Sequence, residues 1–207
     1  MRRMVGAFLF LLVLATSGVS SPASSATCPV PVGGWGVPGA GPGQFNLPTA
    51  LVRDPSGRWL ITDQHNNRVQ IFDPVGNPLG SFGSFGTGPG QLFHPSGIAV
   101  GSNNLVYVTD HQNHRVSVFT LAGAFVQTFG SYGLGPGQLR YPVGIDVDAA
   151  GRVYVADYQN NRIQMFLLDG SFVGSLAAGL VSGPYGVRVA SDATVWVGEY
   201  DGHFVRR

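Results

Sequence analysis

The histidines are the residues of this sequence whose type best suits metal binding or proton transfer. The chain has five of them, His65, His94, His111, His114 and His203. A zinc site needs three or four converging nitrogen, oxygen or sulfur ligands. These histidines occupy different places in the repeating pattern described below, so we expect solvated loop residues. If zinc or calcium is bound, the candidate ligands are His94 and His111, because His94 would lie nearest the central axis.

Three matching segments supply a second set of residues that could do chemistry. They are Asp63-Gln64-His65-Asn66-Asn67-Arg68, Asp110-His111-Gln112-Asn113-His114-Arg115 and Asp157-Tyr158-Gln159-Asn160-Asn161-Arg162. In a structural role, each Asp would accept backbone hydrogen bonds and pair with the Arg across a tight turn. In a functional role, the carboxylates would form a ring at a channel mouth. Because the pattern recurs in every unit, we predict that Asp63, Arg68, Asp110, Arg115, Asp157 and Arg162 are structural.

The segments belong to a repeat of 47 residues. Gly-Pro-Gly-Gln occurs at Gly41, Gly88 and Gly135, which are 47 residues apart (88 − 41 and 135 − 88). A period of this size is typical of stacked or circular repeats, in which one unit cannot bury its apolar faces alone. We therefore divide the chain into units at about 41–87, 88–134, 135–180 and 181–207, the last one completed by 30–36.

Each unit contains four short runs of β-branched and aromatic residues separated by turns. In the second unit they are Gly97–Val100, Leu105–Thr109, Val116–Phe119 and Phe125–Phe129. Asp, Asn and Gly between the runs favour tight hairpins, so each unit is predicted to be an up-and-down four-stranded sheet. Both faces of these strands are apolar, as sheets stacked face to face around an axis require. The predicted fold is therefore an all-β protein, a β-propeller of four four-stranded blades.

The fourth unit lacks its last run, and the N-terminal side of the repeats carries a spare one. Trp35 lies 47 residues before Phe82 (82 − 35), so Val30–Gly36 matches the missing run. We predict that it pairs with His203–Arg206 and closes the ring. The alternative is an open arc, or a fragment of a six-bladed propeller. On the innermost strands, Asp146 and Arg188 stand at equivalent repeat positions and are predicted to form an ion pair.

Asp-x-x-Asn-x-Arg followed by Val/Ile-x-Val-Phe, and preceded by Gly-Pro-Gly-Gln and Pro-x-Gly-Ile, resembles the NHL repeat. The resemblance covers residues 35–207, with three strong copies and a weak fourth in which Phe204 stands in place of the Arg. It implies a β-propeller, most often six-bladed, that serves as a binding platform. Some relatives bind RNA or proteins, and a peptide-amidating lyase with a similar propeller holds zinc with channel histidines.

The N-terminus resembles a secretory signal. Arg2 and Arg3 precede the apolar run Val5–Ala15, and small residues allow cleavage after Ala26. The apolar run is shorter than the ~20 residues of a spanning helix. We therefore predict a signal peptide over 1–26, a repeat domain over 27–207, a secreted, periplasmic or cell-envelope location, and no stable membrane span after processing. One cysteine, Cys28, cannot form an internal disulfide framework.

The charge distribution argues against a nucleic-acid partner. All twelve basic residues are arginines, and without Arg2 and Arg3 ten of them face 11 acidic residues. No basic face is evident, whereas nucleic-acid binders normally have one. Nucleophile elbows, phosphate-binding loops and metalloprotease motifs are also missing from the sequence.

We therefore expect an exported, non-catalytic binding platform for a protein, peptide or glycan. The alternative is a propeller-type lyase or lactonase with a metal at the channel mouth. The binding surface is predicted on the face that carries aromatic and arginine residues in its loops, since such residues anchor partners. The candidates are Phe93, Tyr132, Tyr141, Tyr158, Tyr200 and Arg140, together with Phe45.

Overall fold

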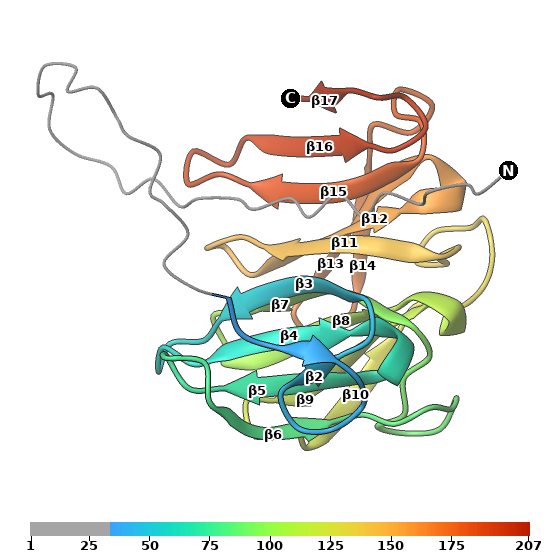
Figure 1. Cartoon of the computed structure of the whole chain (residues 1–207). Coiled ribbons are helices and arrows are strands. Elements are labelled where there is room, and N and C mark those ends of the chain that lie inside the picture. The colour runs from blue at the N-terminus through green and yellow to red at the C-terminus, as the bar shows by residue number, and fades with distance from the viewer. Residues whose placement is uncertain (1–33) are drawn as a thin grey trace, which may run out of the picture. The chain divides into compact units, whose positions relative to one another are not determined.

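Short strands joined by tight turns account for nearly all of the regular structure (Figure 1). The computed structural model describes residues 34–207, of which Gly36–Arg207 form one compact unit. The predicted signal peptide, Cys28 and residues 30–33 of the predicted closing strand lie outside the described residues. All-β architecture is confirmed for the part that is described. No helix there is long and apolar enough to cross a bilayer.

Three antiparallel sheets of four strands follow one another along the chain. The first blade contains β3 (Pro48–Arg53), β4 (Trp59–Asp63), β5 (Arg68–Phe72) and β6 (Pro78–Phe82). The second contains β7 (Pro95–Val100), β8 (Leu105–Asp110), β9 (Arg115–Thr120) and β10 (Phe125–Phe129). The third contains β11 (Pro142–Val147), β12 (Arg152–Asp157), β13 (Arg162–Leu167) and β14 (Phe172–Leu176). Each strand pairs with the next one in sequence, so the predicted up-and-down order is confirmed.

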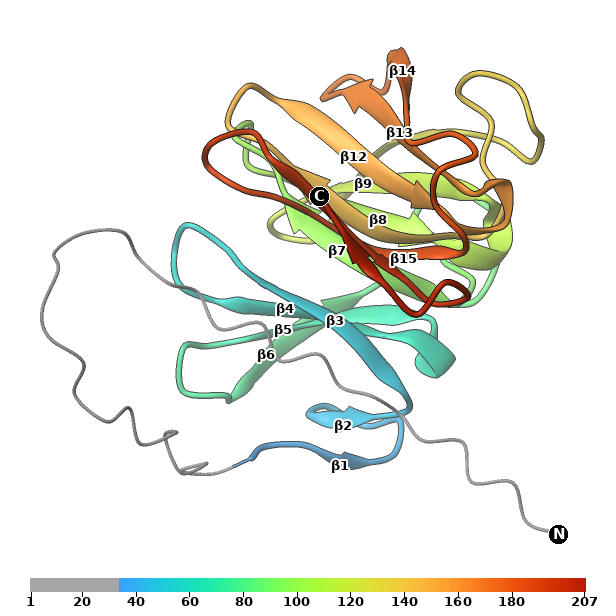
Figure 2. The same cartoon turned by 90° about the horizontal axis from the view of Figure 1, so that it is seen from above.

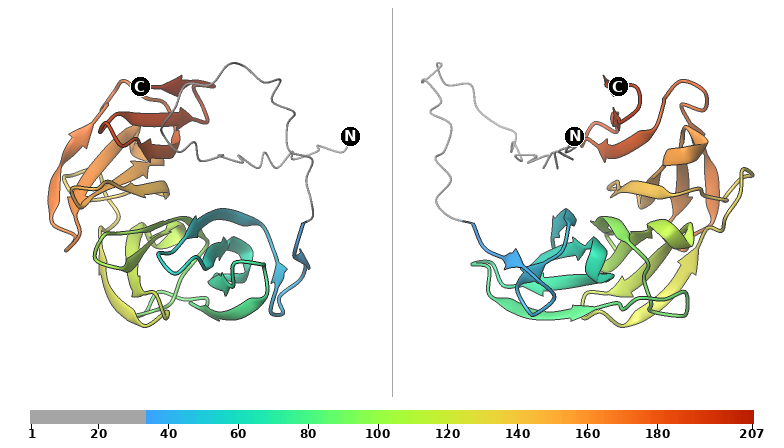
Figure 3. Two further views of the ribbon diagram at one scale, coloured as in Figure 1. Left: turned by 90° about the vertical axis from the view of Figure 1, so that its left-hand side faces the viewer. Right: turned by 45° about the vertical axis from the view of Figure 1, so that its right-hand side comes forward.

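The fourth sheet has three strands among the described residues. They are β15 (Pro184–Val189), β16 (Val195–Glu199) and β17 (Val205–Arg206). Gly34–Gly36, the described end of the predicted closing strand, is in no strand, and the next two residues form β1 (Val37–Pro38), which pairs in parallel with β2 (Gln44–Phe45). The protein is thus a β-propeller of four blades, not the six that are commonest for this kind of repeat (Figure 3).

The hydrophobic core consists of three layers, one between each pair of successive blades. Between the first and second blades, Leu60 and Val69 pack with Val106 and Phe119. Equivalent layers surround Tyr107 between the second and third blades, and Ile163 between the third and fourth. A blade with two apolar faces is stable only when both are covered, which explains the absence of the hydrophobic–polar alternation of a one-sided sheet.

The innermost strands β3, β7, β11 and β15 line the axis, with the other strands of each blade outside them (Figures 2 and 3). The chain passes from β4 to β5 through a 3-10 turn, η1 (Gln64–Asn66). It does so again through η2 (His111–Asn113) and η3 (Tyr158–Asn160) in the next two blades. Each turn ends on a left-handed residue, Asn67, His114 or Asn161, with φ of 50 to 56°. The three turns lie at the same end of the axis (Figure 1), which we call the turn face.

Candidate binding face

The repeated Asp–Arg pairs hold the turn face together. Arg68, Arg115 and Arg162 donate through Nε to the Oδ2 atoms of Asp63, Asp110 and Asp157 at 2.9, 2.8 and 2.8 Å. The three carboxylates are completely buried. They are therefore not a ring of exposed acidic groups available to a ligand or a metal.

In the second blade, for example, Asp110 Oδ1 accepts the backbone N–H of Phe93 at 2.7 Å, and Oδ2 also accepts the side-chain amide of Asn113 at 2.8 Å. The guanidinium of Arg115 continues to the carbonyl oxygens of Gly88 and Gln91 at 3.2 and 3.1 Å. One buried ion pair thus fixes the turn to the crossover segment that enters the same blade.

The fourth blade modifies this network. Glu199 stands where the other blades have Asp, and its Oε2 accepts the backbone N–H of Ser182 at 3.0 Å. Phe204 stands where the others have Arg, but Arg206 pairs with Glu199 instead. The longer Glu199 side chain thus pairs with Arg206, two residues after the position where the other blades have Arg. The sequence motif did not predict this pair.

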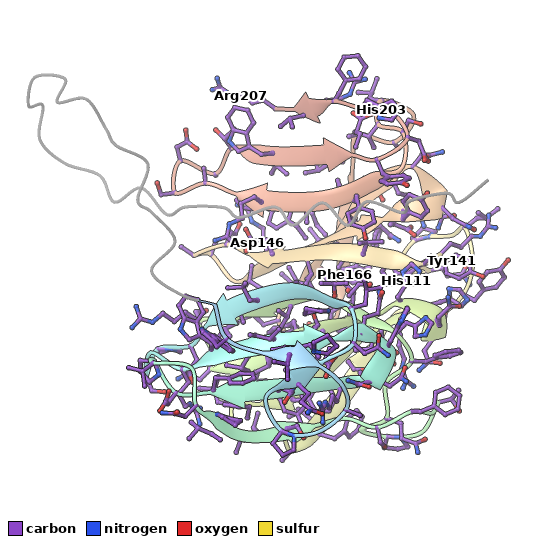
Figure 4. The ribbon with its side chains drawn as sticks, in the orientation of Figure 1. His111, Tyr141, Asp146, Phe166, His203 and Arg207 are labelled. Carbon is purple, nitrogen blue, oxygen red and sulfur yellow. The ribbon has the colours of Figure 1, made fainter. Side chains whose placement is uncertain are left out.

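Asp146 and Arg188, predicted to pair, do so with an NH1–Oδ1 distance of 3.4 Å. Burial raises the pKa of Asp146, although its Oδ2 accepts the backbone N–H of Val189 at 2.7 Å. Figure 4 shows Asp146 at the end of β11 opposite to His111 and Tyr141. This pair therefore joins the third and fourth blades away from the turn face.

The histidines lie on or near the turn face in separate small groups. The rings of His65 and His94 are 5.1 Å apart, whereas His114 Nδ1 accepts the backbone N–H of Tyr141 at 3.1 Å. His111 Nδ1 lies 3.1 Å from the carbonyl oxygen of Pro142, a distance at which a protonated Nδ1 donates and Nε2 remains an acceptor. Among the described residues, no group of three or more His, Cys, Asp or Glu side chains could hold a metal ion.

Burial lowers the pKa of three of these histidines. For His111, desolvation is the largest cause, and nearby His94 and His114 lower its pKa further. For His94, desolvation and then His65 lower the pKa, and for His114, desolvation and then Arg140 do so. The pKa of each of these three groups is shifted below its ordinary value of 6.5, which favours the neutral imidazole at pH 7.

Aromatic rings cover the turn face in a series of contacts. Phe93 packs edge-on against Phe85 at 5.0 Å and against His94 at 4.9 Å. Tyr141 packs against the rings of His111 and His114 at 5.2 and 4.4 Å. The guanidinium of Arg140 lies 5.6 Å from the ring centre of Tyr132, which is 60% exposed.

A hollow of about 280 Å³ opens beside these rings. It is lined by Gln64, Ser96, His111, Val143, Tyr158, Tyr185 and Tyr200. None of these side chains is an acid or an arginine. The ring of Tyr185 lies 6.4 Å from Tyr158 and 5.7 Å from Tyr200, so three tyrosines form one wall. The hollow can therefore accept an uncharged group that stacks on aromatic rings and forms hydrogen bonds.

The hollow is built from two repeat positions. The residue that follows the acidic end of the second strand supplies Gln64, His111, Tyr158 and Tyr200. The residue that follows the first proline of the inner strand supplies Ser96, Val143 and Tyr185. Side chains from neighbouring blades meet there, as Gln64 Nε2 does with Ser96 Oγ at 2.8 Å. The framework Asp and Arg are the same in the first three blades, whereas at these two positions only Tyr158 and Tyr200 are alike.

The structure brings only some of the predicted binding residues together. Tyr158 and Tyr200 line the hollow, and so does His111, which was considered as a metal ligand. Tyr141, Tyr132 and Arg140 form a group around His114 outside the hollow, in which Tyr141 also touches His111, and Phe93 lies against His94. Phe45 packs instead against Phe72 at 5.6 Å. Tyr185, Gln64 and Ser96 were missed, although comparing equivalent repeat positions would have found them.

Comparisons with known proteins agree with this architecture. The sequence model of the NHL repeat matches residues 94–119 and 139–166. Two NHL repeats are thus identified by sequence, in a chain that folds as a β-propeller, as the repeated motifs predicted.

Solved structures with a similar fold include three enzymes. A catalytically inactive virginiamycin B lyase from Staphylococcus aureus, solved with quinupristin, has a TM-score of 0.61 at 19% identity, over 76% of this chain and 50% of that one. A gluconolactonase from Xanthomonas campestris has a TM-score of 0.60 at 19% identity, over 76% and 55%. Hydrazine synthase from Kuenenia stuttgartiensis has a TM-score of 0.58 at 19% identity, over 72% and 41%. The chain thus spans about half the length of these structures, and the likeness is one of fold.

Proposed function

We propose that this chain is an exported, non-catalytic binding platform whose turn face holds a protein, peptide or glycan partner. One observation supports this most strongly. Three blades share the same Asp–Arg framework and the fourth keeps it in modified form, while the two positions that line the hollow carry a different side chain in almost every blade. A scaffold of this kind holds varied side chains at one place without altering the blades that carry them.

The chemistry of the lining indicates the kind of group that is bound. Three tyrosines offer apolar ring faces with polar tips, which suits contacts that are partly apolar and partly hydrogen-bonded. Gln64, Ser96 and neutral His111 add an amide, a hydroxyl and an imidazole. The volume is below the ~300–1,000 Å³ of a site for a drug-sized molecule. We therefore infer that the hollow takes one uncharged unit, such as a sugar ring or a peptide side chain, of a longer partner.

The aromatic rings outside the hollow would extend the contact with that partner. Tyr132 and Tyr200 are 60% and 64% exposed, and tyrosine and arginine are enriched among residues that dominate binding energies. A partner that spans the turn face would contact the Tyr132–Arg140 pair as well as the hollow, whereas a short ligand would contact the hollow alone.

Titration calorimetry with neutral oligosaccharides and with a library of unstructured peptides tests this function. Tyr200→Ala should weaken binding of any short probe by about tenfold or more, because truncating an anchoring residue costs roughly 1–2 kcal/mol or more. Tyr132→Ala is the matched control, an equally exposed tyrosine outside the hollow, and should leave short probes unaffected. Equal losses in both variants, or conversion of a probe to product, would contradict the proposal.

A further inference from the structure

The two ends of the blade series leave apolar sheet faces uncovered. Leu51 on β3 is 52% exposed, whereas Ile98 and Ile145, at the same position in the next two blades, are each 6% exposed. Trp196 on β16 is 42% exposed, whereas Tyr107 and Tyr154, its equivalents, are 0% and 2% exposed. Within residues 34–207, therefore, no sheet covers the outer face of the first blade or the outer face of the fourth.

Gly186 on β15 indicates which kind of surface fits the uncovered face of the fourth blade. A Cβ on Gly97 would collide with the carbonyl oxygen of Val143 on the next blade. A Cβ on Gly144 would lie 2.6 Å from the carbonyl oxygen of Tyr185. At these positions glycine is needed because the next inner strand comes too close for a side chain. The first blade has Ala50 here, so a methyl group is the largest side chain found at any of the three contacts.

Gly186 occupies the same position in the fourth blade, yet nothing lies within 4 Å of a Cβ placed there. Its backbone conformation does not require glycine either, since its φ is not in the left-handed region. Gly186 thus has the residue type found where another inner strand docks. No inner strand docks there among the described residues.

We propose that the uncovered face of the fourth blade binds the uncovered face of the first blade of a second copy of this chain. Each blade has one face turned toward the preceding blade and one turned toward the following blade. In each of the three contacts inside the chain, the face of one blade that is turned forward along the series packs against the backward-turned face of the next blade. The face around Gly186 and Trp196 is turned forward along the series, and the face around Leu51 is turned backward. The two exposed faces therefore complement each other, and the new contact continues the interfaces already present.

Two such contacts would close a pair of copies into one ring of eight blades. Rings of up to about eight blades are known for this architecture, and a contact between unlike faces forms a closed assembly when the rotation closes. The expected assembly is therefore a dimer in which both copies bury Leu51 and Trp196.

Substitutions of glycine distinguish an effect on association of two copies from an effect on folding of one copy. Gly186→Val has free space within one copy, so the melting temperature measured at dilutions that favour monomers should be unchanged. In the dimer the added methyl groups meet the neighbouring strand, and overpacking of this size weakens association by roughly tenfold to a hundredfold. Gly80→Val is the matched control, because Gly80 also has nothing within 4 Å but lies on the outermost strand β6. It should change neither property.

Sedimentation velocity of the protein produced from the whole sequence, over a wide concentration range, is the test. The proposal predicts a concentration-dependent dimer that persists in Gly80→Val and dissociates in Gly186→Val. A monomer at every concentration, or a dimer unaffected by Gly186→Val, would overturn it. If the protein is a monomer, acrylamide quenching of a variant that keeps Trp196 as its one tryptophan shows whether another part of the same chain covers the face.

Mixing two defective variants tests whether unlike faces meet. Leu51→Asp damages only the first blade, and Gly186→Val damages only the fourth. Each variant alone should be monomeric, but the mixture retains one intact pair of faces and should form a mixed dimer. If Leu51→Asp still forms dimers alone, like faces meet and the proposal is wrong. Failure of the mixture to associate would contradict it as well.

Discussion

Gln64 and Ser96 come from neighbouring blades, and the Gln64 side-chain amide donates a 2.8 Å hydrogen bond to the Ser96 hydroxyl. Both residues line the hollow on the turn face. The bond shows how neighbouring blades meet: the first residue of the turn in one blade reaches the start of the inner strand of the next. The side chains that differ between blades are thus gathered in one place by backbone features that the blades share.

Asp110 is predicted to be among the residues most important for stability. It is fully buried, and its carboxylate binds Arg115, Asn113 and the backbone of Phe93. Asp110→Ala would leave the half-buried guanidinium without its partner, which typically costs about 3–5 kcal/mol. Chemical denaturation measures this loss. Asp73→Ala, which removes an exposed turn carboxylate with similar local hydrogen bonds, should change stability little, and a similar loss in both variants would contradict the structural role of Asp110.

Tyr107 is predicted to hold the second and third blades together through its hydroxyl. This group donates to the carbonyl oxygen of Leu168 at 2.8 Å and accepts from the side-chain amide of Asn103 at 2.9 Å. Tyr107→Phe keeps the buried ring but removes both bonds, so we expect a loss of about 1–2 kcal/mol. Thermal or urea unfolding measures it. Tyr132→Phe, in which the ring is exposed, is the control, and an unchanged stability in Tyr107→Phe would show that water replaces the hydroxyl at no cost.

Stability should fall as the pH is lowered through the titration range of the histidines. Burial depresses the pKa of His111 below 6.5 in the folded chain, so the unfolded chain takes up its proton first. The contribution is therefore fully present above pH 6.5 and is lost as the pH falls through the lower folded pKa. His94 and His114 act in the same direction.

Melting temperatures recorded between about pH 7.5 and 5 check this sign. His111→Gln cannot be protonated in this range and should flatten the decrease. Burial raises the pKa of Asp146, which acts in the opposite direction. A melting temperature that rises on acidification from pH 7, or an unchanged slope in His111→Gln, would contradict this assignment.

Metal analysis of the purified protein distinguishes the binding platform from the lyase or lactonase alternative. We expect no stoichiometric zinc or calcium, because His94 and His111 belong to different small groups and the described residues contain no set of three candidate ligands. His94→Ala and His111→Ala should accordingly leave the metal content unchanged. One zinc or calcium ion per chain that is lost in these variants would refute the non-catalytic proposal.

The strands and their order could be predicted from the sequence because the 47-residue repeat occurs in three closely similar copies. Hairpin turns with Asp and Gly, and two apolar faces per strand, leave few arrangements other than stacked four-stranded sheets. The weak fourth unit was harder. Phe204 stands there in place of the Arg, and the structure shows that the longer Glu199 side chain pairs with Arg206 instead.

The candidate site was predicted less completely because chemical type was considered before repeat position. Aromatic residues were selected from the loops, which included Phe45, a residue that packs on Phe72. Tyr185 was omitted because it lies within a strand, although it stands at the same position as Ser96 and Val143. The second residue of the inner strand lines the hollow in the second, third and fourth blades, and alignment of the repeats is what relates these residues.

Hydrogen exchange of the backbone amides, with and without the tightest-binding oligosaccharide or peptide from the titrations, tests the central claim most directly. The account predicts that binding slows exchange in residues 64–67, 111–114 and 158–161, which form the turn face. It predicts no change in the turns at the opposite ends of the blades, residues 54–58, 101–105 and 148–152. Protection of those opposite turns, with the turn face unaffected, would contradict the assignment of the binding site.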